Sequence, residues 1–487
     1  MRRALGLLAA GVAVAAGCGG EDDPLAELRA ADSVREVRED AGTDGLVVTV
    51  EPRTGPAAIA EAVEAVPREV RRATFRDGRA ELVLAGASAR RQASSSAAAL
   101  AALARVRSPA RRIAVEATGG APRVRAEVDG PAQAAPLARE VVALVGPERL
   151  RGDAVRDVVV QQAGTEARDA FTVVLRLSGT PADAPKLAAL DAVEALAARE
   201  PRLTAVGPGV DLRVTAADVD DAGAAWAQAA GALDGSARGD VDLSVAVGDA
   251  PVLGGPADTS PRRAVALLRA FGDAVVAPYA RTDLSTVRAR LAEPRTNRAA
   301  VADAARAARS AAAAGAERLE VQWPTGDDVE WLGAVPGIDA TSASVADTPA
   351  GVLRVLPAFH RAHAARFPAI RWSRPAPGRL ARLELGRPEL VDELEDEESG
   401  GGSGSVLGGR ARSRRLARTI RAIGWPGTAR FELPVGKGTC AGDRSSTVVE
   451  VVSTAAGRAK SVDARYGCAD AELVRAFRDT WDDTASR

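Results

Sequence analysis

The sequence predicts an α+β protein of tandem ferredoxin-like modules, each with the order β-α-β-β-α-β, followed by a small disulfide-tied α+β C-terminal domain. Three observations carry this prediction. Short β-branched runs alternate with Ala- and Leu-rich segments of helical period. The same order of strands and helices returns along the chain, in units of varying length. A segment of only Gly and Ser then separates the last part of the chain from the rest.

The first module is expected over residues 45–120. The run Leu46–Val50 predicts a strand, and Gly55-Pro56 begins a helix because proline is favoured in the first helical turn. Asp77-Gly78 is a strong signal for a two-residue hairpin. The serines Ser94–Ser96 then offer N-caps to an Ala-rich helix.

Three further modules are expected over residues 121–208, 209–282 and 283–388. In the second, Arg123–Val128 alternates strictly between apolar and charged residues, which predicts a half-buried strand. The third is irregular, and one of its hairpin strands is not visible in the sequence. The fourth follows the order again and carries an extra strand at Arg379–Leu385.

An acidic and Gly/Ser linker is expected over residues 389–409, followed by the C-terminal domain over 410–487. A basic block opens that domain. Three interpretations of the block stay open: a solvated helix face, pairing with the acidic residues 389–398, or an anionic partner such as lipid headgroups or a wall polymer. The block consists of Arg410, Arg412, Arg414, Arg415, Arg418 and Arg421.

The composition excludes several classes of protein. The 487 residues include 64 Lys and Arg against 65 Asp and Glu, so the large basic surface of a nucleic-acid-binding protein is not expected. With 3 Cys and 2 His, a zinc-rich or haem-dense protein is excluded, and no cofactor is expected. Aromatic residues make up only 3%, which argues against a groove that stacks sugars or bases.

The N-terminus has the layout of a signal peptide over residues 1–17. Arg2 and Arg3 precede the apolar run Ala4–Ala16, which is too short for a bilayer span of about 20 residues. The end of this run, Ala15-Ala16-Gly17-Cys18, resembles the lipobox of bacterial lipoproteins, with Ala15 where that family usually has Leu. The resemblance implies cleavage after Gly17, attachment of a diacylglycerol to Cys18 through a thioether, and a tether over residues 18–44.

The alternative for the N-terminus is an ordinary secretory signal with a chance cysteine.

The amino-acid composition also indicates the kind of organism that the protein comes from. The chain is rich in Ala and Arg, and its only lysines are Lys186, Lys437 and Lys460. This bias resembles that of proteins from high-GC bacteria such as actinobacteria, and it carries no chemistry by itself.

The two remaining cysteines, Cys440 and Cys468, are expected to form a disulfide, because an exported chain meets an oxidising compartment. The alternative is a redox-active pair, but the Cys-x-x-Cys spacing of such pairs is absent from the sequence.

The two histidines, His360 and His363, lie three residues apart in a predicted helix and are weak candidates for a metal site. A core or half-buried role fits them better, because His363 shares the apolar stripe with Val352, Leu356 and Phe359. Phosphate-loop, dinucleotide-binding, nucleophile-elbow and calcium-loop motifs are all incomplete in the sequence. No catalytic residue is therefore nominated.

The sequence thus favours a non-catalytic, lipid-anchored extracytoplasmic protein of the bacterial cell envelope that binds or scaffolds. Its expected partners are the membrane, through Cys18, and an envelope protein or wall polymer; nucleic acid is not expected. One alternative is a solute-binding receptor of a transporter, which needs a deep cleft between two large lobes. Another is an envelope hydrolase.

Overall fold

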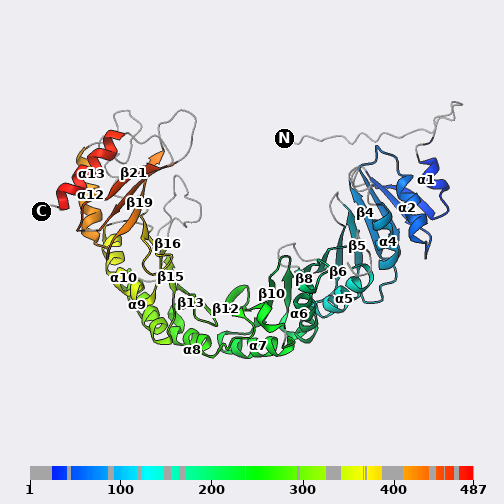
Figure 1. The fold of residues 1–487 in the computed structure, drawn as a ribbon, viewed down its shortest axis with the longest axis horizontal. Coiled ribbons are helices and arrows are strands. Elements are labelled where there is room, and N and C mark those ends of the chain that lie inside the picture. The colour runs from blue at the N-terminus through cyan, green and yellow to red at the C-terminus, as the bar shows by residue number, and fades with distance from the viewer. Residues whose placement is uncertain are drawn as a thin grey trace, which may run out of the picture. The chain divides into compact units, whose positions relative to one another are not determined.

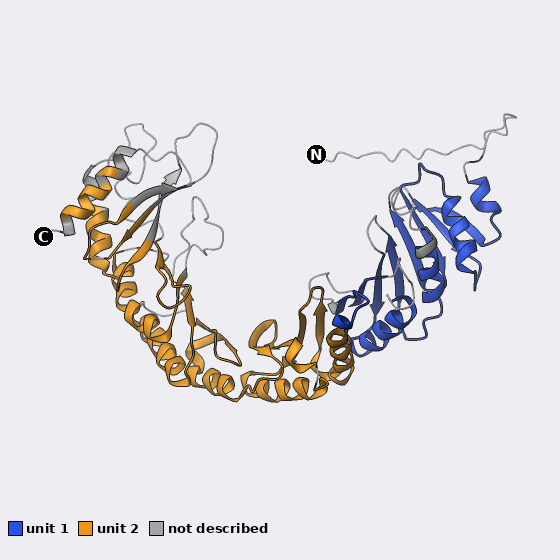
Figure 2. Cartoon of the chain, in the orientation of Figure 1, with its two compact units in different colours: residues 1–183 blue, residues 184–487 orange. Residues whose placement is uncertain are grey.

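A computed structural model gives the fold of the chain. It describes residues 23, 25–40, 45–85, 93–117, 122–146, 155–163, 171–235, 237–292, 297–324, 342–365, 367, 370–385, 410–437, 446–454, 456–465 and 471–485. The chain forms two compact units, residues 1–183 and residues 184–487 (Figure 2).

The first unit alternates strands and helices from its beginning. Its described elements are α1 (Ala26–Ala30), β1 (Val34–Asp40), β2 (Gly45–Val50), α2 (Pro56–Glu64), β3 (Arg72–Asp77), β4 (Ala80–Ala85), α4 (Ala93–Leu103), β5 (Arg112–Ala117), β6 (Arg123–Val128), α5 (Ala134–Val145), β7 (Asp157–Gln162) and β8 (Phe171–Arg176). The predicted tether and lead segment therefore contains a short helix and a strand within its described part.

The strands of the first unit pair in chain order. Hairpin partners are antiparallel, as in β3–β4, β5–β6 and β7–β8. Strands joined by a helix are parallel, as in β2–β3 across α2, β4–β5 across α4 and β6–β7 across α5. The repeating unit is thus one strand, one helix and a second strand that pairs directly with the first (Figure 1).

The second unit continues the same pattern. Its described elements are α6 (Ala184–Ala195), β9 (Arg202–Ala205), β10 (Val210–Ala216), α7 (Val219–Ala232), β11 (Val241–Val247), β12 (Ala250–Pro256), α8 (Arg262–Phe271), β13 (Val275–Arg281), β14 (Val287–Leu291), α9 (Asn297–Ala314), β15 (Leu319–Pro324), β16 (Ser342–Asp347), α10 (Pro349–Ala364), β17 (Ile370–Ser373), β18 (Ala381–Leu385), α12 (Arg410–Ile423), β19 (Ala429–Lys437), β20 (Ser446–Ser453), β21 (Ser461–Arg465) and α13 (Ala471–Ala485). Parallel pairs span α7, α8, α9, α10 and α12.

The core of each unit lies between one face of its strands and a row of helices. In β2, every second residue is buried: Leu46, Val48 and Val50. On α2 the buried residues include Ile59 and Val63, which lie four apart on one face of the helix. Neighbouring helices also contact one another, as α2 does α4 and α7 does α8, so each repeat packs on the next.

This pairing corrects the predicted ferredoxin-like modules, although a mixed protein of helices and strands is confirmed. In a split β-α-β arrangement, another strand lies between the two strands that one helix connects. Here β2 pairs directly with β3, with Leu46 beside Ala73 and Val48 beside Phe75. The order of elements along the chain is common to both arrangements, so only the pairing distinguishes them. The observed organisation is that of an α/β repeat protein.

The ladder also crosses the predicted module boundaries. β5 pairs with β6 across residue 120, β9 with β10 across residue 208, and β13 with β14 across residue 282. β18 pairs in parallel with β19, so the strands before and after the predicted linker belong to one ladder. The linker residues themselves lie outside the described residues. Strand pairing therefore continues where the sequence suggested separate domains.

The hairpin strand that the sequence did not show is β12, Ala250–Pro256. Two glycines hide it, because glycine is unfavourable in most strands. A Cβ on Gly254 would lie 2.5 Å from the Tyr279 hydroxyl, so the ring crosses the strand there. Gly255 has φ +143°, and a Cβ on it would lie 2.5 Å from the Thr282 hydroxyl. Both glycines are required by close packing against β13 and the turn that follows it.

We expect Gly255→Ala to destabilise the second unit by about 1–3 kcal/mol, because it combines an unfavourable φ with a clash against Thr282. Urea denaturation followed by circular dichroism measures this as a lower midpoint. The control is Gly209→Ala, since a Cβ there meets nothing within 4 Å. Equal midpoints for the two variants would show that the packing at Gly255 is not needed.

Candidate functional site

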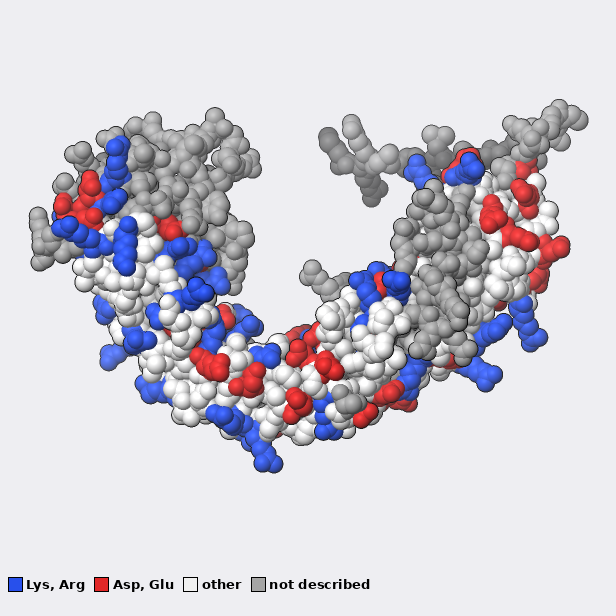
Figure 3. All heavy atoms as spheres, in the orientation of Figure 1, with Lys and Arg blue, Asp and Glu red and all other residues white. Residues whose placement is uncertain are grey.

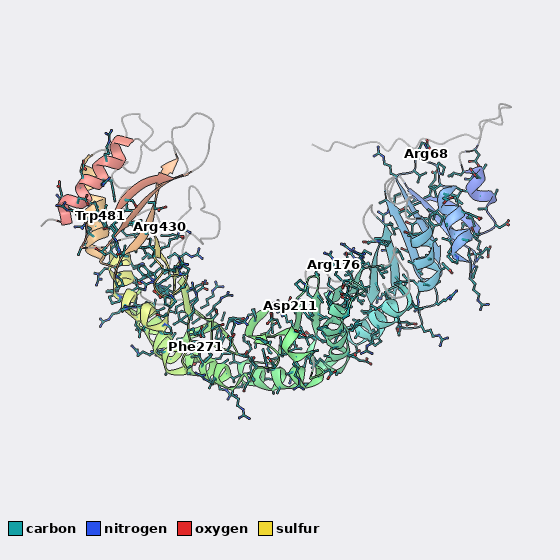
Figure 4. All side chains as sticks on the ribbon, in the orientation of Figure 1. Arg68, Arg176, Asp211, Phe271, Arg430 and Trp481 are labelled. Carbon is teal, nitrogen blue, oxygen red and sulfur yellow. The ribbon has the colours of Figure 1, made fainter. Side chains whose placement is uncertain are left out.

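Each sheet has a second face, which points away from the helices and which we call the open face. It carries the alternate residues of each strand, such as Arg123, Arg125 and Glu127 of β6, whose neighbours Val124 and Ala126 are buried. Charged residues of both signs lie on this face among uncharged ones, and Figure 3 shows basic and acidic side chains along the strand side of the second unit. In Figure 4, Asp211 of β10 lies on the strand side of the second unit, and Phe271 lies in the helix row.

The first cluster of the open face joins three adjacent strands. Arg76 of β3 lies 3.0 Å from a carboxylate oxygen of Glu81 on β4, measured from its Nε. Arg112 of β5 approaches the other oxygen, with its Nη2 at 2.6 Å. The Glu81 side chain is only 11% exposed, whereas those of Arg76 and Arg112 are 47% and 44% exposed. The largely buried carboxylate of Glu81 therefore forms ion pairs with two exposed guanidinium groups.

The second cluster repeats this arrangement on β6, β7 and β8. Arg176 binds Asp157 in a bidentate pair, with its Nε 2.7 Å from Oδ1 and its Nη2 3.2 Å from Oδ2. Arg123 lies on the other side of the same carboxylate, with Nη2 3.7 Å from Oδ2. The hydrogen bond and the charge of Asp157 raise the pKa of Arg176. We call the two clusters the Arg-carboxylate-Arg triplets.

Between the triplets, Arg125 of β6 lies 3.9 Å from Glu116 of β5. A consistent pattern emerges over β3–β8. The open-face arginines are mostly exposed, whereas the described open-face carboxylates are buried or half-buried. The arginines are Arg72, Arg76, Arg112, Arg123, Arg125 and Arg176, and the carboxylates are Glu81, Glu116, Glu127 and Asp157. A partner that approaches this face would first meet positive charge.

The open face of the second unit is more mixed. Asp211 of β10 lies beside Asp242 of β11 in the parallel ladder. Partial desolvation and the negative charge of Asp242 raise the pKa of Asp211. Farther along, Arg288 lies over the ring of Tyr279, 5.4 Å from its centroid, and pairs with Glu320 at 3.5 Å. This face therefore carries a pair of neighbouring carboxylates at one place and an Arg–Glu ion pair at another.

The two histidines do not form a metal site within the described part of the chain. His360 is exposed, and its Nδ1 lies 3.3 Å from the side-chain nitrogen of Asn297. His363 is half-buried in α10, as its place on the apolar stripe suggested. Among the described residues, no group of three His, Cys, Asp or Glu side chains is arranged to hold a metal ion.

The basic block divides into residues of different roles. Arg415 and Arg418 are exposed on α12. Arg421 is half-buried: its guanidinium lies 4.9 Å from the centre of the Trp481 ring, and its Nη2 donates to the Gly457 carbonyl at 2.6 Å. Desolvation lowers the pKa of Arg421. Arg410, Arg412 and Arg414 belong to α12, but their side chains lie outside the described residues.

Several other predictions also fall outside the described residues: Cys18 with the signal peptide, the pair Cys440 and Cys468, and the acidic and Gly/Ser segment 389–409. No described helix is both long enough and apolar enough to cross a bilayer.

Sequence reasoning missed the open face as a site. The alternation over Arg123–Val128 was used only to predict a strand, although its charged positions are the open face of β6. The link between Asp157 and its two arginines is invisible in the sequence, because the three residues lie on three different strands.

Comparison of the chain with protein-family models, with curated proteins and with solved structures found no match.

We expect Arg421→Ala to destabilise the C-terminal part of the chain by about 1–3 kcal/mol, because it removes both the contact with Trp481 and the hydrogen bond to Gly457. Arg418→Ala, one turn earlier and exposed, is the matched control and should change stability by less than about 0.5 kcal/mol. Thermal unfolding of both variants tests the assignment. A melting temperature lowered equally by both substitutions would contradict it.

Proposed function

We propose that this chain is a non-catalytic binding or scaffolding protein, anchored by a lipid at the extracytoplasmic face of a bacterial membrane. The observation that carries the proposal is the open face. Each unit presents a row of adjacent strands on which arginines and carboxylates form ion pairs from strand to strand. Such a surface suits an extended partner, because every added repeat lengthens it without changing its design.

The chemistry of the open face supports binding over catalysis. A general acid or base must lie within hydrogen-bond reach of the proton that it transfers. The oxygens of the triplet carboxylates are instead engaged by guanidinium groups of the same face. An arginine fixed beside a carboxylate keeps its charge and its orientation, which are properties of a binding surface.

The anchor is proposed from the resemblance of Ala15-Ala16-Gly17-Cys18 to a lipobox. An exported location also fits the proposed disulfide between Cys440 and Cys468. β19 and β21 both pair with β20 in antiparallel fashion, so they run in the same direction and their last residues lie at the same end of the sheet. Cys440 comes three residues after the end of β19 at Lys437, and Cys468 comes three residues after the end of β21 at Arg465. The shared direction of the two strands supports the proposed disulfide.

The anchor gives one prediction. In cells, Cys18→Ser should move the protein from the membrane fraction to the soluble fraction, or leave the precursor unprocessed, because the thiol that would carry the diacylglycerol is lost. Fractionation and mass spectrometry of the N-terminus measure this outcome. Normal processing and membrane retention of Cys18→Ser would contradict the lipoprotein proposal, and Cys440→Ser is the control for a general effect of cysteine loss.

The binding role gives a second prediction, tested by a photo-crosslinking amino acid placed at single positions in cells. Gln161 of β7 and Gln322 of β15 lie on the open face, and Ala143 of α5 and Arg309 of α9 are exposed on the helix rows. We expect discrete crosslinked products from the two glutamine positions and not from the two helix positions. Crosslinks from the helix positions alone would assign binding to the opposite side.

A further inference from the structure

We propose that the first unit pairs with a second copy of this chain through strand β1 (Val34–Asp40), in an antiparallel dimer whose two-fold axis passes at Val37. The proposal goes beyond the binding role suggested above, and it depends neither on the lipid anchor nor on binding at the open face. Two observations carry it: β1 is an edge strand of the first unit, and the charges along β1 are self-complementary.

The position of β1 makes one of its sides available for pairing. Among the described strands, β1 pairs with β2 alone. A strand that is paired on one side directs a row of backbone N–H and C=O groups away from the sheet, and these groups can pair with another strand. Four of the seven residues of β1 are exposed: Arg35, Glu36, Arg38 and Glu39. A second strand can therefore reach this edge.

The charges along β1 are complementary to their own reverse order about Val37, since the strand reads Val-Arg-Glu-Val-Arg-Glu-Asp. In an antiparallel pair centred on Val37, Glu36 of each chain lies opposite Arg38 of the other. Arg35 lies opposite Glu39 in the same way. Because the two-fold axis repeats each pairing, four cross-strand pairs of opposite charge form. Opposite charges placed directly across an antiparallel pair stabilise it, and like charges destabilise it.

The proposed register also keeps each side chain on its own face of the sheet. Val37 lies beside the buried Val48 of β2 and so on the core side, whereas Arg38 lies beside Val47 on the open face. Glu36 shares the open face, because its Oε1 lies 2.9 Å from Nε of Arg38. In the dimer, this pair and its symmetry copy place two glutamates and two arginines in alternation. The two Val37 side chains meet at the axis on the other face.

The central pairs are the most important ones in this arrangement. The register of β1 with β2 shifts between Val34 and Glu36, so Arg35 lies at an irregularity of the strand. From Glu36 onward the register is regular. The side chains of Glu36 and Arg38 are 48% and 65% exposed, so both can contact a second copy while they remain close to each other.

Other arrangements of two β1 strands bring like charges together. A shift of the antiparallel register by two residues centres the pair on Glu36 or on Arg38, which places two glutamates or two arginines opposite each other. A parallel pair in register places every charge opposite its own copy. A shift by one residue places open-face side chains opposite core-side ones. Among these arrangements, only the antiparallel pair centred on Val37 satisfies both charge and face.

The test uses the full chain with Cys18→Ser, so that no lipid contributes to association, and measures dimerisation by sedimentation equilibrium. Arg35→Glu with Arg38→Glu makes all four positions acidic, and Glu36→Arg with Glu39→Arg makes them all basic. We expect each of these variants alone to dimerise at least about tenfold more weakly than the parent chain, because every cross-strand pair becomes repulsive.

Mixing the two variants separates a loss of pairing from a folding defect. An acidic β1 and a basic β1 again form four pairs of opposite charge, so we expect a mixed dimer, identified by its mass in native mass spectrometry. Mixing would not correct a folding defect. The matched control is Arg68→Glu with Arg105→Glu, which makes the same charge change at exposed loop positions of the first unit. We expect it to dimerise like the parent chain.

Three results would overturn the proposal. The first is a parent chain that stays monomeric up to about 100 μM, well above a micromolar dissociation constant. The second is dimerisation that neither charge-reversed variant weakens. The third is a mixture of the two variants that contains no mixed dimer. In cells, a photo-crosslinking amino acid at Val37 should give a product of two copies of this chain, and a product with a different protein in place of the second copy would also overturn the proposal.

Discussion

The direct parallel pairing of the two strands that each helix connects is the constraint on which the rest of this structure depends. β2–α2–β3 and β10–α7–β11 show it in the two units. Because the helix returns the chain to the neighbouring position, each new strand adds at the growing edge. Backbone hydrogen bonds are then satisfied one strand at a time, and contacts stay between neighbouring repeats. The long ladder follows from this local rule.

Because of this pairing, the strands of each unit have one face that packs against the helices and one face that does not. Within each unit, the described crossover helices contact their neighbours and lie over the same face of the strands, so that face carries the apolar residues and forms the core. The alternate residues are left on the open face, where side chains of different strands meet at fixed spacing. Arg76, Glu81 and Arg112 meet because three neighbouring strands carry them, and Arg123, Asp157 and Arg176 meet in the same way.

An arginine has two different uses in this chain, and its surroundings decide between them. Arg421 is half-buried against Trp481 and donates to a backbone carbonyl, so its charge stabilises the packing of α12 on α13. Arg176 lies on a strand, its side chain is 52% exposed, and it forms a bidentate ion pair with Asp157. The basic block is visible in the sequence because its arginines lie close together on one helix, whereas the arginines of the triplets are far apart in the sequence.

The sequence by itself determined the order of elements and most of the core, because the periods of Arg123–Val128 and of Ile59 and Val63 report which side of a strand or helix is buried. It also indicated the half-buried place of His363. It did not determine which strands pair, since a split arrangement and direct pairing share one order of elements. The strand β12 was not predicted, because its glycines Gly254 and Gly255 make room for Tyr279 and Thr282, which lie in another part of the chain. The Arg-carboxylate-Arg triplets were decided only by tertiary structure, because register between strands, and not spacing along the chain, brings their charges together.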